Sequence, residues 1–255
     1  MRRSKREMVP IRHREEEMRI LVLKHVDCEG LGVWEEFCRG ERIAVDVAQL
    51  HRGDPLPPPG RYHGVVSLGG PMNVYQEEIY PFLKMEDQFI REALAGGVPF
   101  LGICLGGQLL AKAVGGIVML NAAKEIGWHR VTLNEMGVRD PLFAGLPESF
   151  TVFQWHSDTF RPPVQAVPLA SSPVCQDQAF RLRGFAYALQ FHLEVTAPMI
   201  GEWARAYELA EPRILAEAPA QCERLRPLSR QVFENFLRLL RLTGAARHRR
   251  AAERV

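Results

Sequence analysis

The segment Val98-Pro-Phe-Leu-Gly-Ile-Cys-Leu-Gly-Gly-Gln108 decides the fold of this chain and points to its chemistry. Residues 98–103 form a short apolar run typical of a buried strand, and residues 105–114 have the composition of a helix. Cys104 is therefore predicted on the turn between the strand and the helix, with a glycine two residues to either side. This pattern is a Gly-x-Cys-x-Gly form of the nucleophile elbow, a tight turn that lifts a reactive atom above a sheet.

The position of Cys104 favours chemistry, with a structural role as the alternative. A side chain at a helix N-terminus faces unpaired backbone N–H groups and the positive end of the helix dipole, which stabilise a thiolate. Gly102 and Gly106 let neighbouring backbone pass close by, because they carry no Cβ. The alternative is a buried structural cysteine, since free cysteine is among the most buried residue types.

Composition indicates one soluble domain. The chain has 255 residues, of which 47% are hydrophobic and 24% charged, and this fits one large α/β domain. Its net charge of +2 predicts no nucleic-acid partner, and no apolar run reaches the roughly 18 residues that a membrane span needs. The five cysteines are scattered without Cys-x-x-Cys spacing, so we expect neither disulfides nor a metal site. Such a chain suits a reducing cytoplasm, which a thiolate nucleophile also requires.

Basic residues gather at both ends of the chain. Residues 1–17 and 243–255 are predicted to be disordered basic tails that flank a single domain over residues 18–242. Glu7, Pro10 and the acidic residues at 15–17 stand where a secretory signal would need an apolar core, so no signal is predicted.

The order of predicted elements gives the fold class. Strands and helices alternate up to Gly116, which indicates a parallel sheet covered on both faces. After Gly116 the pattern changes to short strands separated by turns, which favours antiparallel pairing. We therefore expect an α/β fold with a mostly parallel open sheet flanked by helices and an additional small antiparallel sheet. The expected strands are 19–26, 43–47, 62–68, 98–103, 128–133, 149–153, 167–170, 179–182 and 185–190; the expected helices are 31–39, 81–95, 105–114, 198–209 and 229–242.

A thiol nucleophile needs a base, and His192 is the best placed of the eight histidines. It follows directly on an apolar strand, and Glu194 lies two residues further on. In an extended segment these two side chains point the same way, so Glu194 can reach the imidazole and fix its tautomer. The alternative is that His192 merely ends a strand and that Glu194 is solvated.

Two backbone amides are candidates for an oxyanion hole. Ligands of open α/β sheets bind outside the carboxyl ends of the strands, where both Cys104 and the segment Gly69-Gly-Pro71 are predicted. Leu105 follows the nucleophile and would supply one amide. A glycine of the neighbouring loop could supply the second, although a plain tight turn also explains Gly69-Gly70.

These residues resemble the class I, or triad-type, glutamine amidotransferases. The resemblance covers about residues 18 to 200 and implies a flavodoxin-like fold. The chain looks most like stand-alone proteins related to the glutaminase domain of GMP synthase, a group that also resembles plant γ-glutamyl peptidases. The matching motifs, in the family's order, are Gly69-Gly-Pro71, Gly102-Ile-Cys-Leu-Gly-Gly-Gln108, Trp155-His-Ser-Asp158 and Gln190-Phe-His-Leu-Glu194.

The resemblance implies a role for each matching residue. Cys104 would be the nucleophile, His192 the general base and acid, and Glu194 the orienting carboxylate. The oxyanion-hole amides would come from Gly70 and Leu105. The implied substrate-binding residues are Gln108, which would contact the bound glutamine, and Trp155, His156, Ser157 and Asp158, which would hold its amino-acid end largely through backbone.

Two positions depart from the family's usual pattern. Trp155 stands where relatives usually have serine, and Ser157 where they usually have glycine. Both are expected in the part of the pocket that reads the α-amino and α-carboxylate groups, so substrate identity is open. The segment Glu125-Ile-Gly-Trp128 also resembles the family, and Glu125 is either structural or a residue at the pocket rim.

The resemblance implies acyl transfer through a thioester on Cys104, without a metal or organic cofactor. The sequence contains no Gly-x-x-x-x-Gly-Lys-[Ser/Thr] phosphate loop, so any ammonia acceptor would be a separate synthetase polypeptide. One hypothesis is a glutaminase or amidotransferase-like hydrolase. A second is γ-glutamyl peptide hydrolysis, which Trp155 and Ser157 motivate. A third is a non-catalytic binding module that retains the fold.

Overall fold

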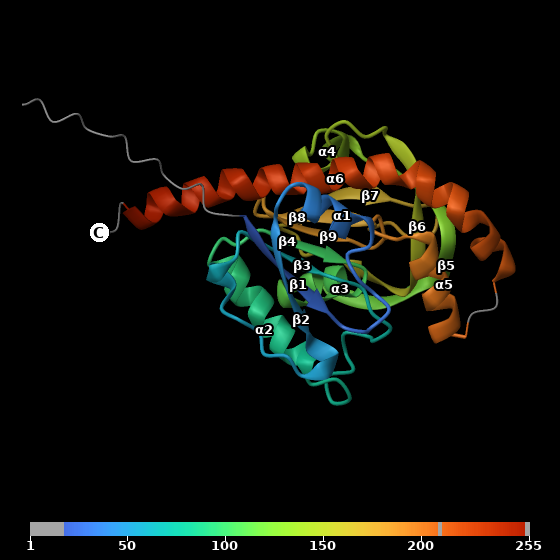
Figure 1. Ribbon diagram of the computed structural model, residues 1–255, viewed down its shortest axis with the longest axis horizontal. Coiled ribbons are helices and arrows are strands. Elements are labelled where there is room, and N and C mark those ends of the chain that lie inside the picture. The colour runs from blue at the N-terminus through green and yellow to red at the C-terminus, as the bar shows by residue number, and fades with distance from the viewer. Residues whose placement is uncertain (1–17, 209–210, 253–255) are drawn as a thin grey trace, which may run out of the picture.

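The computed structural model describes residues 18–208 and 211–252, so the predicted N-terminal basic tail lies outside the described residues. Strands and helices alternate through the first half of the chain, as Figure 1 shows. The strands are β1 (Arg19–Lys24), β2 (Ala44–Gln49), β3 (Gly64–Ser67), β4 (Phe100–Ile103), β5 (Ile117–Leu133), β6 (Ser149–Arg161), β7 (Val167–Ser171), β8 (Ala179–Leu182) and β9 (Ala186–Leu189). The helices are α1 (Val33–Gly40), α2 (Phe82–Ala95), α3 (Leu105–Ala113), α4 (Glu135–Val138), α5 (Ala197–Ala206) and α6 (Pro212–Ala252).

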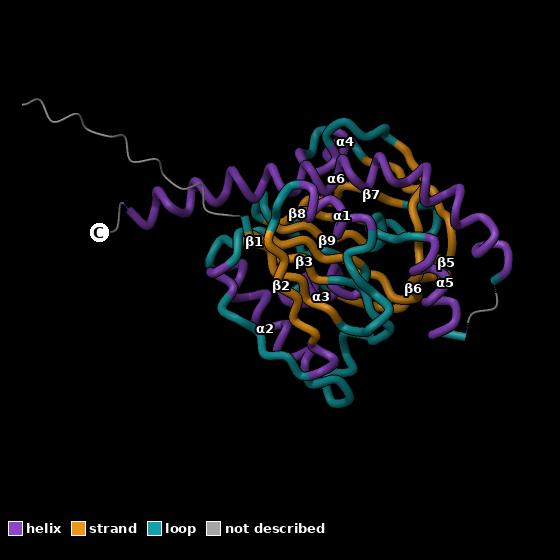
Figure 2. The backbone as a smooth tube through the Cα atoms, viewed as in Figure 1, coloured by secondary structure: helices purple, strands orange, loops and turns teal. Residues whose placement is uncertain are grey.

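The strands form one mixed sheet in the order β2-β1-β3-β4-β9-β8-β7-β5-β6 (Figure 2). The first five are parallel neighbours, and every pair from β9 onward is antiparallel. The α/β class with flanking helices is therefore confirmed. The antiparallel strands are not a separate sheet, however, because β8 pairs with β9 along its whole length and joins the two parts.

Alternation along the buried strands divides the core into two layers. In β1, Ile20 and Val22 face one layer, whereas Leu21 and Leu23 face the other. Successive side chains of a strand point to opposite faces, so a strand buried on both faces reads as a continuous apolar run. Helices α1 and α6 cover the first face, and α2 and α3 cover the second (Figure 1).

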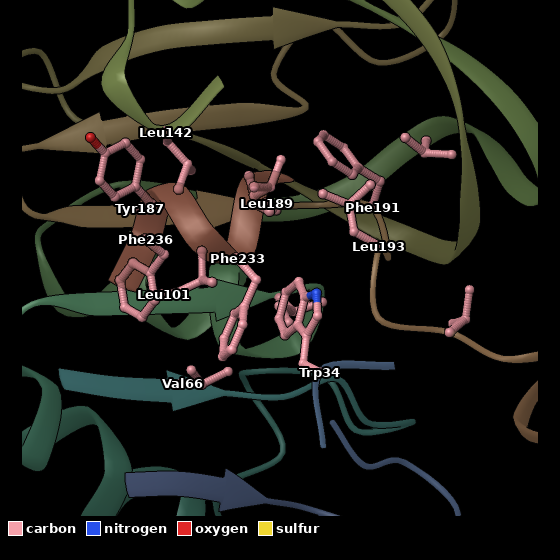
Figure 3. Close-up of a cluster of buried hydrophobic side chains, with 14 of the residues drawn as sticks. Trp34, Val66, Leu101, Leu142, Tyr187, Leu189, Phe191, Leu193, Phe233 and Phe236 are labelled. Atoms are coloured by element: carbon pink, nitrogen blue, oxygen red, sulfur yellow. The ribbon is translucent and has the colours of Figure 1, made fainter. Parts of the chain in front are cut away.

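Helix α6 supplies large side chains to the first layer. Phe233 stacks on Trp34 of α1 with ring centroids 4.7 Å apart and planes at 13°. The indole of Trp34 also donates a hydrogen bond of 2.9 Å to Ser229 Oγ, which satisfies its buried N–H. In Figure 3, Phe233 and Phe236 point from α6 toward the sheet, where Val66 and Leu101 are labelled.

Three elements are longer than the sequence predicted. Strands β5 and β6 pair over most of their length and are longer than the predicted strands 128–133 and 149–153. The added residues include polar ones that interrupt the apolar pattern, but their backbone groups still pair between the two strands. Helix α6 has 41 residues and includes Pro219 and Pro227, which normally argue against a helix interior. Its end takes in residues 243–252, which we expected in a disordered tail and which are rich in the helix formers alanine and arginine.

Within the described ranges, no helix is long and apolar enough to cross a membrane.

Leu240 and Leu242 of α6 make a matched pair for testing this packing. Leu240 is fully buried against Gly64 of β3, whereas Leu242 is 65% exposed. Leu240→Ala is expected to lower the free energy of unfolding by about 2–5 kcal/mol, because it leaves a cavity. Leu242→Ala should change it by less than about 0.5 kcal/mol. Urea denaturation measures both, and equal effects would contradict the assigned face of α6.

Candidate active site

The nucleophile elbow depends on close backbone approach around Cys104. Cys104 precedes α3 with φ of 50°, a conformation that non-glycine residues rarely adopt. A Cβ on Gly102 would lie 2.4 Å from the Gly106 carbonyl oxygen, and one on Gly106 would lie 2.3 Å from the Ser67 carbonyl oxygen. Only glycine fits at these two positions, so α3 can begin directly above the ends of β3 and β4.

Cys104 opens into a cavity of about 300 Å³ at the carboxyl edge of the parallel strands. Glu194 and Leu105 do not line this cavity, but Glu194 contacts His192 and Leu105 follows Cys104, and both of those residues line it. The cavity-lining residues that the sequence predicted are Gly70, Cys104, Gln108, Trp155, His156, Ser157, Asp158 and His192.

His192 and Glu194 form a buried pair next to the nucleophile. His192 Nδ1 lies 2.6 Å from Glu194 Oε1, and the Leu193 amide donates to Glu194 Oε2 at 3.0 Å. The backbone of His192 pairs with Phe153 of β6, which fixes the segment beyond β9. The Trp203 ring packs on the imidazole with centroids 5.0 Å apart. The imidazole is thus held on several sides.

The environment of His192 favours its protonated form. Burial disfavours the imidazolium, but the Glu194 carboxylate and the hydrogen bonds to Cys104 and Glu194 outweigh it. Together they raise the pKa of His192 well above its ordinary value. An imidazolium beside the sulfur stabilises a thiolate and holds a proton for a leaving group.

The loop at Gly69-Gly70 is fixed by a pair that the sequence did not reveal. His25 Nδ1 lies 2.9 Å from the Gly69 carbonyl oxygen, and His25 Nε2 lies 2.7 Å from Glu86 Oε2. A Cβ on Gly70 would lie 2.9 Å from Leu105 Cδ2, so Gly70 packs directly on the residue after the nucleophile. The two predicted oxyanion-hole residues are therefore neighbours.

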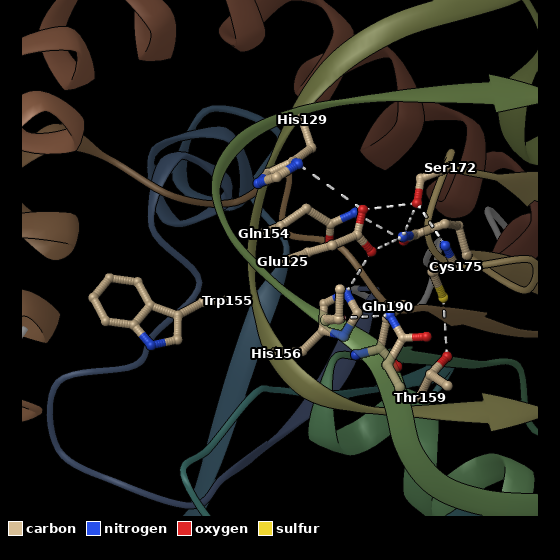
Figure 4. A network of polar contacts seen from close by, with 12 residues as sticks. Glu125, His129, Gln154, Trp155, His156, Thr159, Ser172, Cys175 and Gln190 are labelled. Carbon is tan, nitrogen blue, oxygen red and sulfur yellow. Dashed lines mark hydrogen bonds and ion pairs between the residues drawn. The ribbon is translucent and has the colours of Figure 1, made fainter. Parts of the chain in front are cut away.

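Behind the cavity wall lies a polar network centred on Glu125 (Figure 4). Glu125 is fully buried and accepts hydrogen bonds from Ser172 Oγ at 2.7 Å and Gln178 Nε2 at 2.6 Å. Its Oε2 also lies 3.1 Å from His156 Nε2. Burial alone would raise the pKa of Glu125, but the bonds from His156 and Ser172 and the neighbouring imidazoles lower it. Of the two readings of Glu125, the structural one holds, because the side chain lies behind the pocket rather than at its rim.

A chain of side-chain contacts links this network to the sulfur. The Asp158 carbonyl oxygen accepts from His156 Nδ1 at 2.9 Å and from Gln108 Nε2 at 3.0 Å. Gln108 Nε2 also lies 3.3 Å from Gln190 Oε1, and Gln190 Nε2 lies 3.7 Å from Cys104 Sγ. Gln190 and Gln108 therefore connect Cys104 to strand β6.

The Trp155 ring lies on the other side of β6 from His156 (Figure 4). Its centroid is 6.0 Å from that of Trp203 and 5.9 Å from that of Tyr207. The predicted contact of Trp155 with the substrate stays a prediction. Its ring lines the cavity within the aromatic cluster that includes Trp203, which packs on His192.

The sequence analysis missed five cavity-lining residues with polar groups, which are Glu29, Asn73, Lys124, Trp203 and Tyr207. Glu29 follows β1 at the same sheet edge as Cys104, and that position was the available signal. Tyr207 follows α5 and donates to Glu29 Oε1 at 2.9 Å, a contact between residues far apart in the chain. Among residues 18–208 and 211–252, no group of three His, Cys, Asp or Glu side chains is placed to hold a metal ion.

Comparison with known proteins assigns the family. The family model for class-I glutamine amidotransferases matches residues 42–202. The chain belongs to this family. The glutamine amidotransferase-like protein YfeJ of Salmonella typhimurium is 31% identical over 187 residues, which are 72% of this chain and 78% of that protein.

Solved structures bear out the fold of this family member. The crystal structure of a glutamine amidotransferase from Thermotoga maritima matches with a TM-score of 0.80 and 38% identity, over 88% of this chain and 98% of that one. Similarity also extends to the glutamine-hydrolysing GMP synthase of Aeropyrum pernix, at 37% identity over 150 residues. That region is 58% of this chain but 27% of the synthase.

Gly106→Ala tests the close approach that places the nucleophile. We expect it to destabilise the protein by about 1–3 kcal/mol and to slow alkylation of Cys104, because the new Cβ would displace α3 from Ser67. Gly40→Ala is the matched control: its Cβ meets nothing within 4 Å, so stability should stay equal or rise by up to about 1 kcal/mol. Denaturant unfolding and labelling rates measure both effects. An unchanged Gly106→Ala protein would contradict the proposed constraint.

Proposed function

We propose that this amidotransferase-family chain hydrolyses the γ-amide of glutamine or of a γ-glutamyl compound through a Cys104-His192-Glu194 triad. The observation that carries the proposal is the opening of Cys104 and His192 into one cavity, with His192 backed by Glu194 at 2.6 Å. A binding module without catalysis has no need of a buried imidazole–carboxylate pair at a thiol, so we favour the enzyme.

In the proposed acylation step, the Cys104 thiolate attacks the γ-carbonyl carbon. The amides of Gly70 and Leu105 would stabilise the oxyanion, and a donor of this kind is worth roughly 3–4 kcal/mol. The His192 imidazolium gives its proton to the leaving nitrogen as the C–N bond breaks. A γ-glutamyl thioester on Cys104 and a free amine or ammonia result.

In the proposed deacylation step, neutral His192 takes a proton from water, and the resulting hydroxide attacks the thioester carbon. The C–S bond breaks, glutamate leaves, and the imidazolium and the thiolate are restored. Glu194 acts by holding the His192 tautomer and orientation in both steps.

The polar end of the cavity suits the amino-acid end of the substrate. Asp158 is 5% exposed, and its Oδ2 has no hydrogen-bond partner among the described residues. This oxygen can accept from an α-ammonium group, while Lys124 brings a cation that can pair with the α-carboxylate. Gln108 and Ser157 line the same end.

Two alternatives concern the leaving group of the proposed reaction, which is either ammonia or an amino acid. The relative from Aeropyrum pernix is named a glutamine-hydrolysing GMP synthase, and this chain matches little more than a quarter of it. A separate synthetase subunit is therefore one proposed partner. The alternative is γ-glutamyl peptide hydrolysis, in which no ammonia acceptor is needed. The aromatic rings beside His192 favour this alternative, because ammonia is too small to fill the space that they line.

Cys104→Ala tests the nucleophile. Glutamate release from glutamine and from γ-glutamyl dipeptides should fall to background, because no thioester can form. Mass spectrometry of the wild-type protein should show a γ-glutamyl adduct on Cys104. Cys222→Ala, on α6, is the matched cysteine control and should retain turnover. Comparable turnover in Cys104→Ala would overturn the assignment.

Glu194→Gln tests the triad through its pH dependence. Acylation uses the imidazolium, so it is retained below the folded-state pKa of His192 and lost as pH rises through it. The variant removes the charge that raises this pKa, and burial then lowers it. The alkaline limb of kcat/KM should move to lower pH by at least about one unit. The value of kcat should fall by about 10³–10⁴-fold.

Glu202→Gln on α5 serves as the control, since Glu202 is exposed and lies outside the cavity. Its pH profile of kcat/KM should match that of the wild type. An alkaline limb that stays in place in Glu194→Gln would show that Glu194 does not act through His192.

A further inference from the structure

We propose that the His192 side of the cavity is a subsite for a leaving amine that carries a second, positively charged amino group. The substrate class would then be γ-glutamyl amides of diamines. This inference rests on the proposed function, because it assigns the group that Cys104 acylation releases.

Glu29 gives this subsite a buried carboxyl group. A Cβ on Gly69 would lie 2.3 Å from Glu29 Oε2 and 3.0 Å from His192 Cε1, so the carboxylate and the imidazole sit close together on one side of the Gly69 backbone. Glu29 is 5% exposed and lines the cavity. The leaving nitrogen must meet His192, so the rest of the leaving group extends toward Glu29.

The remaining walls of the subsite are aromatic. Trp155, Trp203 and Tyr207 line the cavity, and the Trp155 ring meets each of the other two edge to face at about 6 Å. Aromatic faces attract ammonium groups through their quadrupole, and the attraction grows when the cation is desolvated. A carboxylate beside aromatic rings is a combination that recognises a cation and its alkyl stem.

The charge balance around Glu29 favours a cationic occupant. Burial raises the pKa of Glu29, and the opposing contributions of His192 and of the Tyr207 hydroxyl do not offset it. The charge of Glu194 also raises the pKa of Glu29, whereas His25 lowers it. An arriving ammonium group would therefore stabilise a carboxylate that its surroundings compensate incompletely. A leaving group that carries a carboxylate would be repelled.

The reaction balances without a further reactant. Cys104 Sγ bonds to the γ-carbonyl carbon, the bond to the amide nitrogen breaks, and that nitrogen takes its proton from His192. The distal ammonium group keeps its charge and stays near Glu29. Water then releases glutamate, so the products are glutamate and a free diamine.

The test compares three γ-glutamyl amides of similar length. One carries 1,4-diaminobutane, one carries n-pentylamine in which a methyl group replaces the ammonium, and one carries 4-aminobutyrate. For the wild-type protein we expect kcat/KM for the diamine compound to exceed that for the pentylamine compound by about tenfold or more. The aminobutyrate compound should be the slowest of the three.

Glu29→Gln should reduce the ratio of diamine to pentylamine kcat/KM to about one, whereas Glu41→Gln, an exposed acid just after α1, should keep the wild-type ratio. The ratio is measured within each variant, so a general loss of activity does not mimic the result. Labelling of Cys104 by a γ-glutamyl-like diazoketone reports whether the acylation site is intact.

Three outcomes would overturn the subsite. A wild-type preference for the neutral, the anionic or the ammonia leaving group would exclude a cationic occupant. A diamine preference that survives in Glu29→Gln would exclude Glu29 as its cause. Failure of the wild type to cleave any of the amides or glutamine, with Cys104 unlabelled, would instead overturn the proposed function and the subsite with it.

Discussion

The structure depends on the close approach of the Gly106 backbone to the Ser67 carbonyl group at the end of β3. With no Cβ between them, helix α3 starts directly above the sheet, and Cys104 takes the left-handed conformation that projects it into the cavity. Because the carboxyl ends of β1, β3, β4 and β9 meet at this edge, the residues that follow those strands converge on the sulfur. A side chain at Gly106 would move α3 away from β3 and so separate Cys104 from these residues.

Buried histidine–carboxylate pairs surround this contact and make the site rigid. Glu194 orients the His192 imidazole, Glu86 and His25 hold the glycine loop, and Glu125 holds His156 of β6. Each pair is almost fully buried, so removing one partner would leave an uncompensated polar group or charge. Such pairs cost free energy of desolvation, and their hydrogen bonds fix the orientation of each imidazole.

Sequence reasoning succeeded where the signal is local. Cys104 with its glycines, and His192 with Glu194 two residues away, are defined by spacing within a few residues, and the structure brings Cys104 and His192 to one cavity. Glu29 and His25 escaped notice because their partners lie far along the chain and no motif marks them. Helix α6 was predicted only over 229–242, whereas it begins at Pro212 and continues through Pro219 and Pro227, residues that by local propensity argue against a helix interior.

The alternation of β6 separates two tasks along one strand. The side chains of Gln154 and His156 donate hydrogen bonds to Gln178 Oε1 and to the Asp158 carbonyl oxygen, whereas the side chains of Trp155 and Ser157 are partly exposed and line the cavity. Trp155 and Ser157 are also the two positions at which the sequence analysis left the identity of the substrate open. Substitutions at every second residue of β6 therefore change the groups that line the cavity, while the hydrogen bonds of the residues between them stay unchanged.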